Sequence, residues 1–311
     1  LPVTTTRSSS QIAGVSKCFT RRLYQNERVL WLELTEKCFG SAMKNLVYYL
    51  DQPGGSFQAK DEAIGEPGPG EIRLKTSKTS VCQSDVVIYN VGLPRIKSWP
   101  AIILHEASCI VDAVGEGVSK FRVGDLVGLG CDIPCGDSSC IYCGPTGTGD
   151  WTSCPNTQAT GHEFSGFARS HAILPQWFVE YGPIVKFQDG FDANRACQLE
   201  PLACGLEGMT RVNNCIENRI VVLLGAGSQS TYALQCAQAM KARKIILVNR
   251  GIDRLERVLR DFGDDNVVGV RWDENVVENV LAECKPFNEP HFVMVNAPVA
   301  AAYEVAPKLM G

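Results

Sequence analysis

Residues 81–127 read VCQSDVVIYNVGLPRIKSWPAIILHEASCIVDAVGEGVSKFRVGDLV. Cys82 stands near the start of this stretch, and the adjacent pair His105 and Glu106 stands in its middle. A thiolate, an imidazole and a carboxylate are ligand types that zinc accepts, and three protein ligands with one open position are typical of a catalytic zinc site. From these residues alone, a buried cysteine beside a hydrogen-bonded histidine is an equally good interpretation.

Chain length, composition and net charge limit the classes of partner. The chain has 311 residues, of which 45% are hydrophobic and 21% charged, as expected for one large or two ordinary globular domains. A formal net charge of −4 and a pI near 5.7 argue against binding to nucleic acid or to an anionic membrane surface. No apolar run approaches the length of a membrane span. We therefore expect neither nucleic acid nor a membrane as partner.

The cysteines are unevenly distributed. There are 14 in the chain, and the short segment 131–154 holds Cys131, Cys135, Cys140, Cys143 and Cys154. A chain of this length with so large an apolar fraction does not need a disulfide framework. In a reducing compartment such a cluster indicates metal binding, and Cys140-x-x-Cys143 forms a sound half-site.

The segment at 1–42 differs from the rest of the chain. It carries Arg7, Lys17, Arg21 and Arg22 among many serines and threonines, with no acidic residue before Glu27. This composition is typical of an organellar transit peptide. A disordered arm or an artefact of expression or of the gene model are the alternatives. We expect residues 1–42 to be an extension without catalytic role, on a protein that is cytoplasmic, or organellar if the extension is a transit peptide.

Residues 43–205 predict a mainly β domain. A strand-like run at 46–50 is followed by turn chemistry in Pro67-Gly68-Pro69-Gly70. Residues 71–76 then alternate polar with apolar side chains, the pattern of a half-buried strand.

Residues 206–311 predict a second, α/β domain. Residues 220–224 are a continuous apolar run, as a strand buried on both faces requires, and a helical segment separates them from the next strand at 244–248. Helices at 254–261 and 274–283, the second with Asp273 as N-cap, and strands at 266–270 and 291–295 continue a doubly wound parallel sheet.

A glycine-rich turn joins the first of these strands to its helix. The residues Gly225-Ala226-Gly227-Ser228-Gln229-Ser230 depart from G-x-G-x-x-G only at the last glycine. The strand before the turn and the helix after it are the context that this dinucleotide-binding pattern needs, with the pyrophosphate at the helix N-terminus. A simple tight turn is the alternative.

The phrase at 115–125, GEGVSKFRVGD, resembles one that follows the metal box in the zinc-dependent medium-chain alcohol and polyol dehydrogenases, the group of sorbitol and threonine dehydrogenases. The resemblance covers roughly residues 43–311 and rests on several motifs in the right order. It implies a GroES-like catalytic domain followed by a Rossmann domain. The sequence stops where family members continue with further strands of the sheet, so we expect an incomplete Rossmann domain.

The resemblance also implies roles for single residues. Cys82 and His105 are expected to bind a catalytic zinc, and Glu200, in the intact phrase Glu200-Pro201-Leu202-Ala203-Cys204, is the candidate third ligand. A surface carboxylate is the alternative for Glu200. Glu106 is expected to reach the metal or to orient its ligands. Ser84 matches the hydroxyl that relays the proton of the substrate alcohol.

Four departures from the family pattern bear on this site. Leu104 and Cys109 stand where the family's Gly-His-Glu box has glycines. Gln83 stands where glycine is usual, and Val87 stands where a relay histidine often lies. The segment Gly161-His162-Glu163-Phe164-Ser165-Gly166 matches the sequence motif of that box better, yet it follows the cysteine cluster. Its place in the motif order is wrong, so we expect His162 to be a loop or pocket residue.

The cysteine cluster resembles the structural-zinc lobe of the same family. The resemblance implies that Cys135, Cys140, Cys143 and Cys154 bind a zinc ion tetrahedrally, although the gaps between them are longer than usual. A lobe that has lost its metal and keeps free thiols is the alternative.

The residues after the second Rossmann strand bear on the choice of cofactor. Asn249-Arg250 stand where NAD-binding members carry an acid, so a 2′-phosphate would meet no repulsion and Arg250 could pair with it. We predict a zinc-dependent oxidoreductase that transfers hydride between a secondary alcohol or polyol and NADP, or NAD. A zinc-free reductase and a non-catalytic scaffold protein are the alternatives, and homo-oligomer formation stays open.

Overall fold

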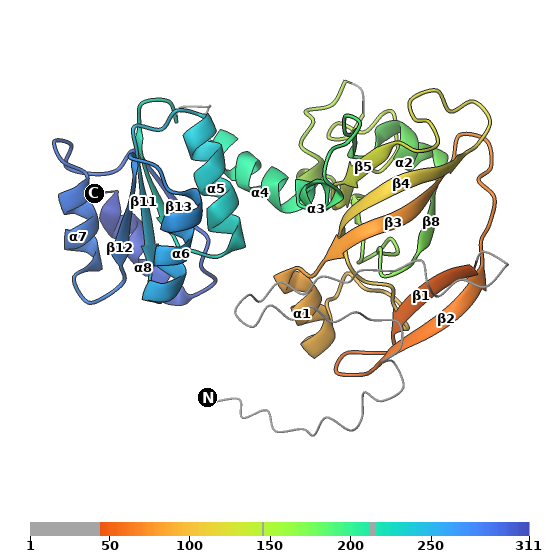
Figure 1. The fold of residues 1–311 in the computed structure, drawn as a ribbon, viewed down its shortest axis with the longest axis horizontal. Coiled ribbons are helices and arrows are strands. Elements are labelled where there is room, and N and C mark those ends of the chain that lie inside the picture. The colour runs from red at the N-terminus through yellow and green to blue at the C-terminus, as the bar shows by residue number, and fades with distance from the viewer. Residues whose placement is uncertain (1–43, 145, 212–215, 311) are drawn as a thin grey trace. The chain divides into compact units, whose positions relative to one another are not determined.

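The computed structural model describes residues 44–144, 146–211 and 216–310 (Figure 1). The chain forms two compact units, which divide between Glu200 and Pro201, a few residues before the boundary predicted at 205/206. The predicted extension at 1–42 lies outside the described residues. None of the described helices is long and apolar enough to cross a membrane.

The first unit is built on an antiparallel sheet of five strands in the order β8-β3-β4-β5-β9. Its strands are β3 (Ile72–Ser80), β4 (Glu106–Val114), β5 (Leu126–Leu129), β8 (His171–Leu174) and β9 (Ile184–Lys186). Two separate hairpins are formed by β1 (Lys44–Leu50) with β2 (Phe57–Ala63) and by β6 (Asp132–Ile133) with β7 (Gln158–Ala159). The helices are α1 (Gln83–Val91), α2 (Gln176–Tyr181) and α3 (Ala193–Ala196), with a 3-10 turn at Trp151–Ser153.

The core of this unit follows from the strand pattern predicted at 71–76. Ile72 and Leu74 of β3 are fully buried, and Leu74 pairs with Val111 of β4. Phe167 and Phe178 pack into the same apolar cluster. Alternate side chains of a strand point to opposite faces, so the apolar members gather on one side of the sheet.

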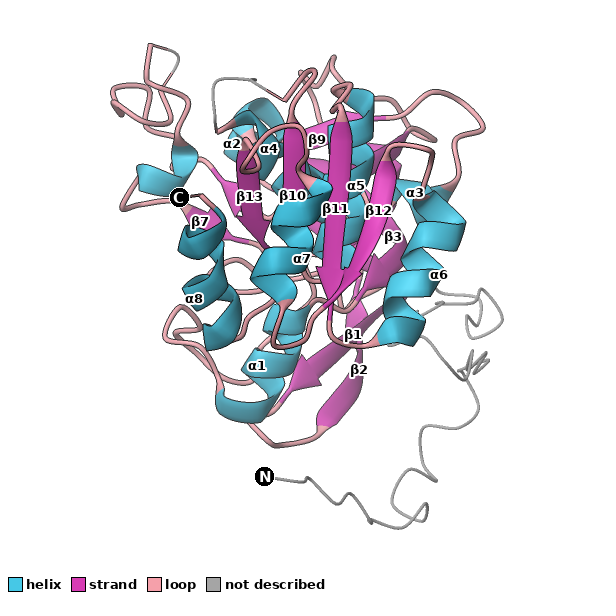
Figure 2. Ribbon diagram, turned by 90° about the vertical axis from the view of Figure 1, so that its left-hand side faces the viewer, coloured by secondary structure: helices cyan, strands magenta, loops and turns pink. Residues whose placement is uncertain are grey.

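The second unit contains a parallel sheet of four strands in the order β12-β11-β10-β13, which lie side by side in Figure 2. The strands are β10 (Ile220–Leu224), β11 (Lys244–Asn249), β12 (Val267–Arg271) and β13 (Phe292–Val295). The helix α4 (Leu199–Thr210) spans the division between the units, and the helices of the second unit are α5 (Ser228–Ala239), α6 (Ile252–Phe262), α7 (Val276–Glu283) and α8 (Ala300–Leu309).

Helices cover both faces of this sheet. Val221 and Leu223 of β10 pack in one cluster with residues of α5 and α6, whereas Ile220, Val222 and Leu224 pack in another with residues of α7 and α8. All five residues of β10 are buried, as the continuous apolar run predicts. The predicted fold, a GroES-like β domain followed by a doubly wound Rossmann sheet, is confirmed.

The start of α7 differs from the prediction. The helix begins at Val276 with Asn275 as N-cap, not at Glu274 after Asp273. Asp273 Oδ1 instead accepts a hydrogen bond from the Asn275 amide at 2.9 Å. The aspartate thus closes a turn that precedes the helix, a role that short acidic side chains perform as readily as capping.

Candidate active site

Cys82, His105 and Glu106 lie together in the first unit. One ligand atom from each lies within 4.8 Å of those of the other two. Cys82 immediately precedes α1, His105 ends the loop that enters β4, and Glu106 is the first residue of that strand. The side chains of His105 and Glu106 are buried, with 3% and 7% of the residue exposed. The two segments that carry the predicted box therefore converge on one point.

The position of Glu106 is fixed by the β3–β4 ladder. Ser80, the last residue of β3, pairs with Glu106 in register, and its hydroxyl donates to Glu106 Oε2. The carbonyl of Glu106 also accepts a hydrogen bond from Thr79 Oγ1 at 2.9 Å. The last rung of the ladder thus holds the carboxylate beside the other two ligand types.

Asp85 connects the two ligand-bearing segments, a role that the sequence analysis missed. Its Oδ2 accepts from the Cys82 amide at 2.8 Å and its Oδ1 from the Leu104 amide at 3.2 Å. Oδ1 also lies 3.8 Å from His105 Nδ1. Metal-binding histidines commonly direct their second ring nitrogen at a carboxylate. The available signal was the position of Asp85 one helical turn after Cys82.

Negative groups surround the imidazole of His105. Burial on its own lowers the pKa of His105, but hydrogen bonding to Cys82 and the charges of Asp85 and Glu200 outweigh burial and raise the pKa to about 9. The same negative charges would also stabilise a metal cation bound to His105. Binding of the cation requires that the imidazole first lose the extra proton.

Glu200 is not one of the three clustered ligand residues. It is half-buried in the first turn of α4, and its charge acts on His105. Its carboxylate does not belong to the Cys82–His105–Glu106 group in the described structure. The roles of Glu106 and of Glu200 as the third metal ligand both stay predictions.

Two polar atoms beside the ligands have no partner. Ser84 Oγ and His105 Nδ1 are buried without a hydrogen bond from any described residue. Buried polar atoms are rarely left unpaired, and in a native structure each one calls for an explanation such as an absent ligand. The donor set fits a metal ion, and the unpartnered Ser84 hydroxyl fits a hydroxylic ligand beside it.

Leu104 has the backbone conformation that the family pattern assigns to glycine. Its φ is 75°, in the left-handed region that side chains disfavour. Leu104 is nevertheless buried in an apolar cluster that includes Leu50, Ile88 and Ile103. The side chain therefore stabilises the loop by burial while the backbone beneath it is strained. The second glycine replacement, Cys109, is simply a fully buried residue of β4.

The second His-Glu segment lies next to the first. Backbone hydrogen bonds join the end of this segment to the loop before His105. The Gly166 amide donates to the carbonyl of residue 102 at 2.7 Å, the Phe167 amide to that of residue 104 at 2.8 Å, and the Ala168 amide to that of residue 103 at 3.1 Å. The rings of His162 and His105 have centroids 5.8 Å apart. Burial first, and then the charge of His105, lower the pKa of His162. His162 is a loop residue, and nothing in the order of the motifs indicated that this loop adjoins the metal box.

The four predicted zinc cysteines form a compact group. The sulfur atoms of Cys135, Cys140, Cys143 and Cys154 all lie within 4.8 Å of one another, and Cys140 Sγ is 3.8 Å from Cys154 Sγ. The amides of Cys143 and Tyr142 each point at Cys140 Sγ from 3.4 Å, and they lower the pKa of Cys140 to about 7.

The longer gaps between the cysteines do not keep the four sulfur atoms apart, and zinc binding by the lobe stays a prediction. Four sulfur atoms within reach of one centre are a donor set suited to a tetrahedral zinc site. The gap between Cys143 and Cys154 contains the 3-10 turn at Trp151–Ser153.

The glycine-rich turn leaves the carboxyl end of β10. Gly225 has a φ of 117°, and its amide donates to the Val248 carbonyl at 2.7 Å. A Cβ added at Gly227 would meet no described atom within 4 Å, so the chain is open in front of the first turn of α5. The exposed Ser228 begins that helix. This geometry fits a pyrophosphate approaching the helix N-terminus.

Asn249 and Arg250 differ in environment. Asn249 Oδ1 accepts from the Ala226 amide at 3.2 Å, and its Nδ2 donates to the Gly251 carbonyl at 2.8 Å. Asn249 therefore braces the glycine-rich turn. Arg250 is exposed just beyond the end of β11. Only Arg250 of the pair presents its side chain to solvent.

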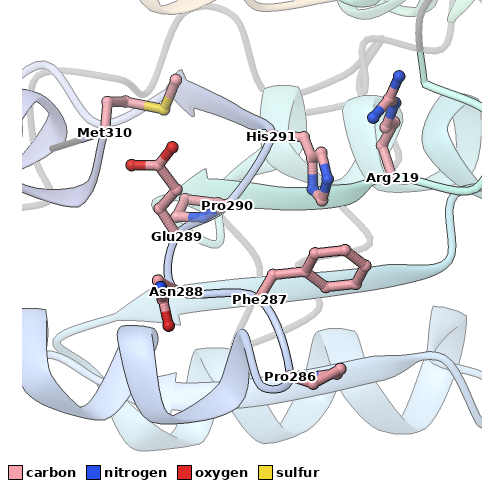
Figure 3. A pocket seen from close by; sticks show the side chains of 8 residues that line it. All are labelled: Arg219, Pro286, Phe287, Asn288, Glu289, Pro290, His291 and Met310. Carbon is pink, nitrogen blue, oxygen red and sulfur yellow. The ribbon is translucent and has the colours of Figure 1, made fainter.

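A groove of about 820 Å³ lies at the other end of the second unit and is lined by Arg219, Phe287, His291 and their neighbours (Figure 3). Arg219 precedes β10 and His291 precedes β13, so the groove is at the amino ends of the strands. Ligands of doubly wound sheets bind at the carboxyl ends. We therefore assign no cofactor to this groove.

Comparison with known proteins agrees with this description. The alcohol dehydrogenase GroES-like domain family matches residues 68–183. The chain is 28% identical over 233 residues to L-threonine 3-dehydrogenase of Pyrococcus horikoshii, covering 74% of this chain and 63% of that protein. It is 29% identical over 224 residues to sorbitol dehydrogenase of Bombyx mori, covering 70% and 61%. The chain belongs to the zinc-type medium-chain dehydrogenase family.

A solved structure extends the match over both units. An Escherichia coli oxidoreductase of unknown specificity superimposes on this medium-chain dehydrogenase with a TM-score of 0.72 and 26% identity, covering 86% of this chain and 74% of that one. The chain spans less than two thirds of the length of the threonine and sorbitol dehydrogenases that it matches. The predicted family is thus confirmed, whereas the ligand and cofactor residues stay predictions.

Proposed function

We propose that this protein is an NAD(P)-dependent oxidoreductase that transfers a hydride between a secondary alcohol or polyol and the nicotinamide. The observation that carries the proposal is the convergence of Cys82, His105 and Glu106 beside the unpartnered hydroxyl of Ser84. A zinc ion at such a site supplies Lewis-acid polarisation of a substrate oxygen. The names of the threonine and sorbitol dehydrogenases support a hydroxylated small molecule as substrate.

Each site residue has a separate role in the proposed reaction. Cys82, His105 and Glu106 (or Glu200) hold the cation, and Asp85 orients His105 through the carboxylate that faces Nδ1 at 3.8 Å. Ser84 Oγ accepts the proton of the substrate alcohol and passes it toward solvent. The backbone from Gly225 to Ser228 binds the pyrophosphate, and the four-cysteine lobe holds a second zinc that stabilises the fold.

We further propose that NADP is preferred to NAD. Arg250 is exposed at the end of β11, where its guanidinium can pair with a 2′-phosphate. Asn249 carries no charge that would repel that phosphate, and its side chain is already engaged in the turn. A cytoplasmic location is proposed with the activity, an organelle being the alternative if residues 1–42 are a transit peptide.

The proposal is tested on the purified full chain in three steps. Metal analysis should find zinc, fluorescence titration should show saturable binding that is tighter for NADPH than for NADH, and a panel of secondary alcohols and polyols should yield reduced cofactor. Arg250→Ala should weaken NADPH binding about 10–150-fold and leave NADH binding unchanged, because one charge-assisted contact is worth about 1.5–3 kcal/mol. Turnover without zinc would favour a zinc-free reductase. Binding of neither cofactor would favour a scaffold protein.

A further inference from the structure

His105 belongs to two groups of metal-ligand side chains. Besides Cys82 and Glu106, its ligand atom lies within 4.8 Å of those of Cys131 and His162, which lie equally close to each other. Two imidazoles and one thiolate form a donor set that zinc accepts. Cys131 and His162 lie outside the metal box and outside the four-cysteine lobe, and only His105 is common to both groups.

The fold brings Cys131 and His162 together through the β6–β7 hairpin. Cys131 directly precedes β6, and His162 lies in the turn that follows β7. The Thr160 amide donates to the Cys131 carbonyl at 3.0 Å, which continues the pairing of Asp132 with Ala159. The two side chains are therefore held by the same pair of strands.

The His162 loop is fixed on both sides. Glu163 forms an ion pair with Arg95 at 2.8 Å and accepts a hydrogen bond from the Ala159 amide at 3.0 Å. Gly161, with a φ of 78°, lies so close to the loop before His105 that a Cβ there would be 3.3 Å from the Leu104 nitrogen. The backbones of the two histidine-bearing loops therefore lie against each other at this point.

His162 is oriented for metal binding. Its Nδ1 lies 3.2 Å from the Thr160 carbonyl, and a proton on that nitrogen satisfies the carbonyl. Nε2 is then left with its lone pair for a ligand, the arrangement in which a backbone carbonyl fixes the tautomer of a metal-binding histidine. His105 is only 3% exposed, and its Nδ1 faces the Asp85 carboxylate at 3.8 Å, which leaves Nε2 as the ring nitrogen for a metal.

We propose that His105, His162 and Cys131 form a second metal position for zinc or a similar divalent transition metal, with His105 shared between this position and the Cys82–Glu106 position. The family's metal box supplies only the shared histidine. The second position concerns metal binding alone and does not depend on dehydrogenase activity, so each can fail without the other.

The test uses cadmium bound to the full chain and observed by 113Cd NMR, in which each bound ion gives a resonance that reports its thiolate ligands. The variant Cys82→Ser removes the only thiolate of the first position. We expect a resonance from one thiolate and two nitrogens to remain in it. That resonance should disappear in Cys82→Ser/Cys131→Ser and in Cys82→Ser/His162→Asn. The matched controls Cys82→Ser/Cys236→Ser and Cys82→Ser/His291→Asn alter residues of the second unit and should keep it.

Two results would overturn the proposal. One is the absence of any single-thiolate resonance in Cys82→Ser while circular dichroism shows a folded chain. The other is a single-thiolate resonance of the Cys82→Ser background that survives removal of both Cys131 and His162. Cadmium affinity measured by competition with a chelator gives a second readout, in which Cys131→Ser in the Cys82→Ser background should weaken binding at least about tenfold.

Discussion

The amide of Leu104 donates a hydrogen bond to Asp85 Oδ1 at 3.2 Å, and Asp85 Oδ2 accepts another from Cys82 at 2.8 Å. One carboxylate therefore links the segment that carries Cys82 with the segment that carries His105. All of α1 lies between the two segments in the sequence. The distance between the two ligands depends on this link as well as on the β3–β4 ladder.

We predict that Asp85→Asn loosens the metal site. An amide has one acceptor oxygen, and its NH2 group would face a backbone N–H, so one of the two hydrogen bonds is lost. Loss of an outer partner of this kind costs about 10–100-fold in metal affinity. Zinc retention against a chelator measures the effect. The control is Asp112→Asn, which removes the carboxylate partner of Arg73 at 2.6 Å in the same unit, and which should leave zinc retention unchanged.

The strained backbone of Leu104 predicts a reversed order of stability for two substitutions. Leu104→Ala and Leu104→Gly both remove the buried side chain, at a cost of about 2–5 kcal/mol. Glycine adopts a φ of 75° without strain, so Leu104→Gly should be more stable than Leu104→Ala by about 1 kcal/mol.

Urea denaturation of both variants measures this order. The neighbouring Ile103 is the matched control because it is 2% exposed and does not have a positive φ. There the alanine variant should be the more stable one, since glycine has the larger conformational entropy when unfolded. The same order at both positions would contradict the assignment of strain to Leu104.

The parts of the fold that the sequence predicted are those in which a local pattern determines the structure. The apolar run of β10 and the glycine-rich turn after it can be recognised from neighbouring residues alone. A strand buried on both faces must be apolar throughout. The alternation in β3 is equally local. Family motifs then predicted which cysteines and histidines to examine, and the structure brings Cys82, His105 and Glu106 together.

The remaining contacts are long-range and have no periodic signal. The whole cysteine cluster lies between His105 and His162 in the sequence, and backbone hydrogen bonds between residues 102–104 and 166–168 bring the two loops together. Asp85 acts through its side chain on two amides, a contact that no pattern of apolar residues predicts. The start of α7 was misplaced because Asp273 can close a turn as well as cap a helix.

The four-cysteine lobe should lose stability when one sulfur is replaced. We expect Cys140→Ser to release one equivalent of zinc and to lower the thermal midpoint, because metal binding to a structural site contributes directly to folding. Cys140 is the informative position, since two amides point at its sulfur. Cys204→Ser alters an exposed cysteine outside the lobe and should change neither quantity. A zinc content equal to that of the unsubstituted chain would contradict the assignment.

His171 should make the stability of the first unit depend on pH. Burial, followed by the charges of Arg73 and Lys75, lowers the pKa of His171 below its usual 6.5, although Asp112 opposes the shift. The unfolded chain therefore binds more protons below about pH 6.5, and the stabilising contribution is lost as the pH falls through the folded pKa.

We expect His171→Gln, which cannot be protonated, to remove this part of the pH dependence. Urea midpoints of the unsubstituted chain and of the variant should differ by a constant amount at pH 7 and above, and the difference should shift in favour of the variant as the pH is lowered below about 6.5. All other groups titrate in both proteins, so the difference isolates His171. A difference that does not change with pH would contradict the prediction.

Ser230 replaces the last glycine of the dinucleotide-binding pattern, and its hydroxyl is fully buried in α5 without a described hydrogen-bond partner. Ser230→Ala should therefore stabilise the chain by about 1 kcal/mol or more, because an unsatisfied buried hydroxyl is removed and alanine has the higher helix propensity. Gln235→Ala, at an exposed position of the same helix, also gains helix propensity but loses a hydrogen bond to the Thr231 carbonyl at 3.2 Å, and should stabilise the chain less. Chemical denaturation distinguishes the two variants. If Ser230→Ala is destabilising, the hydroxyl has a partner in solution, and a water or the cofactor itself would be the first candidate.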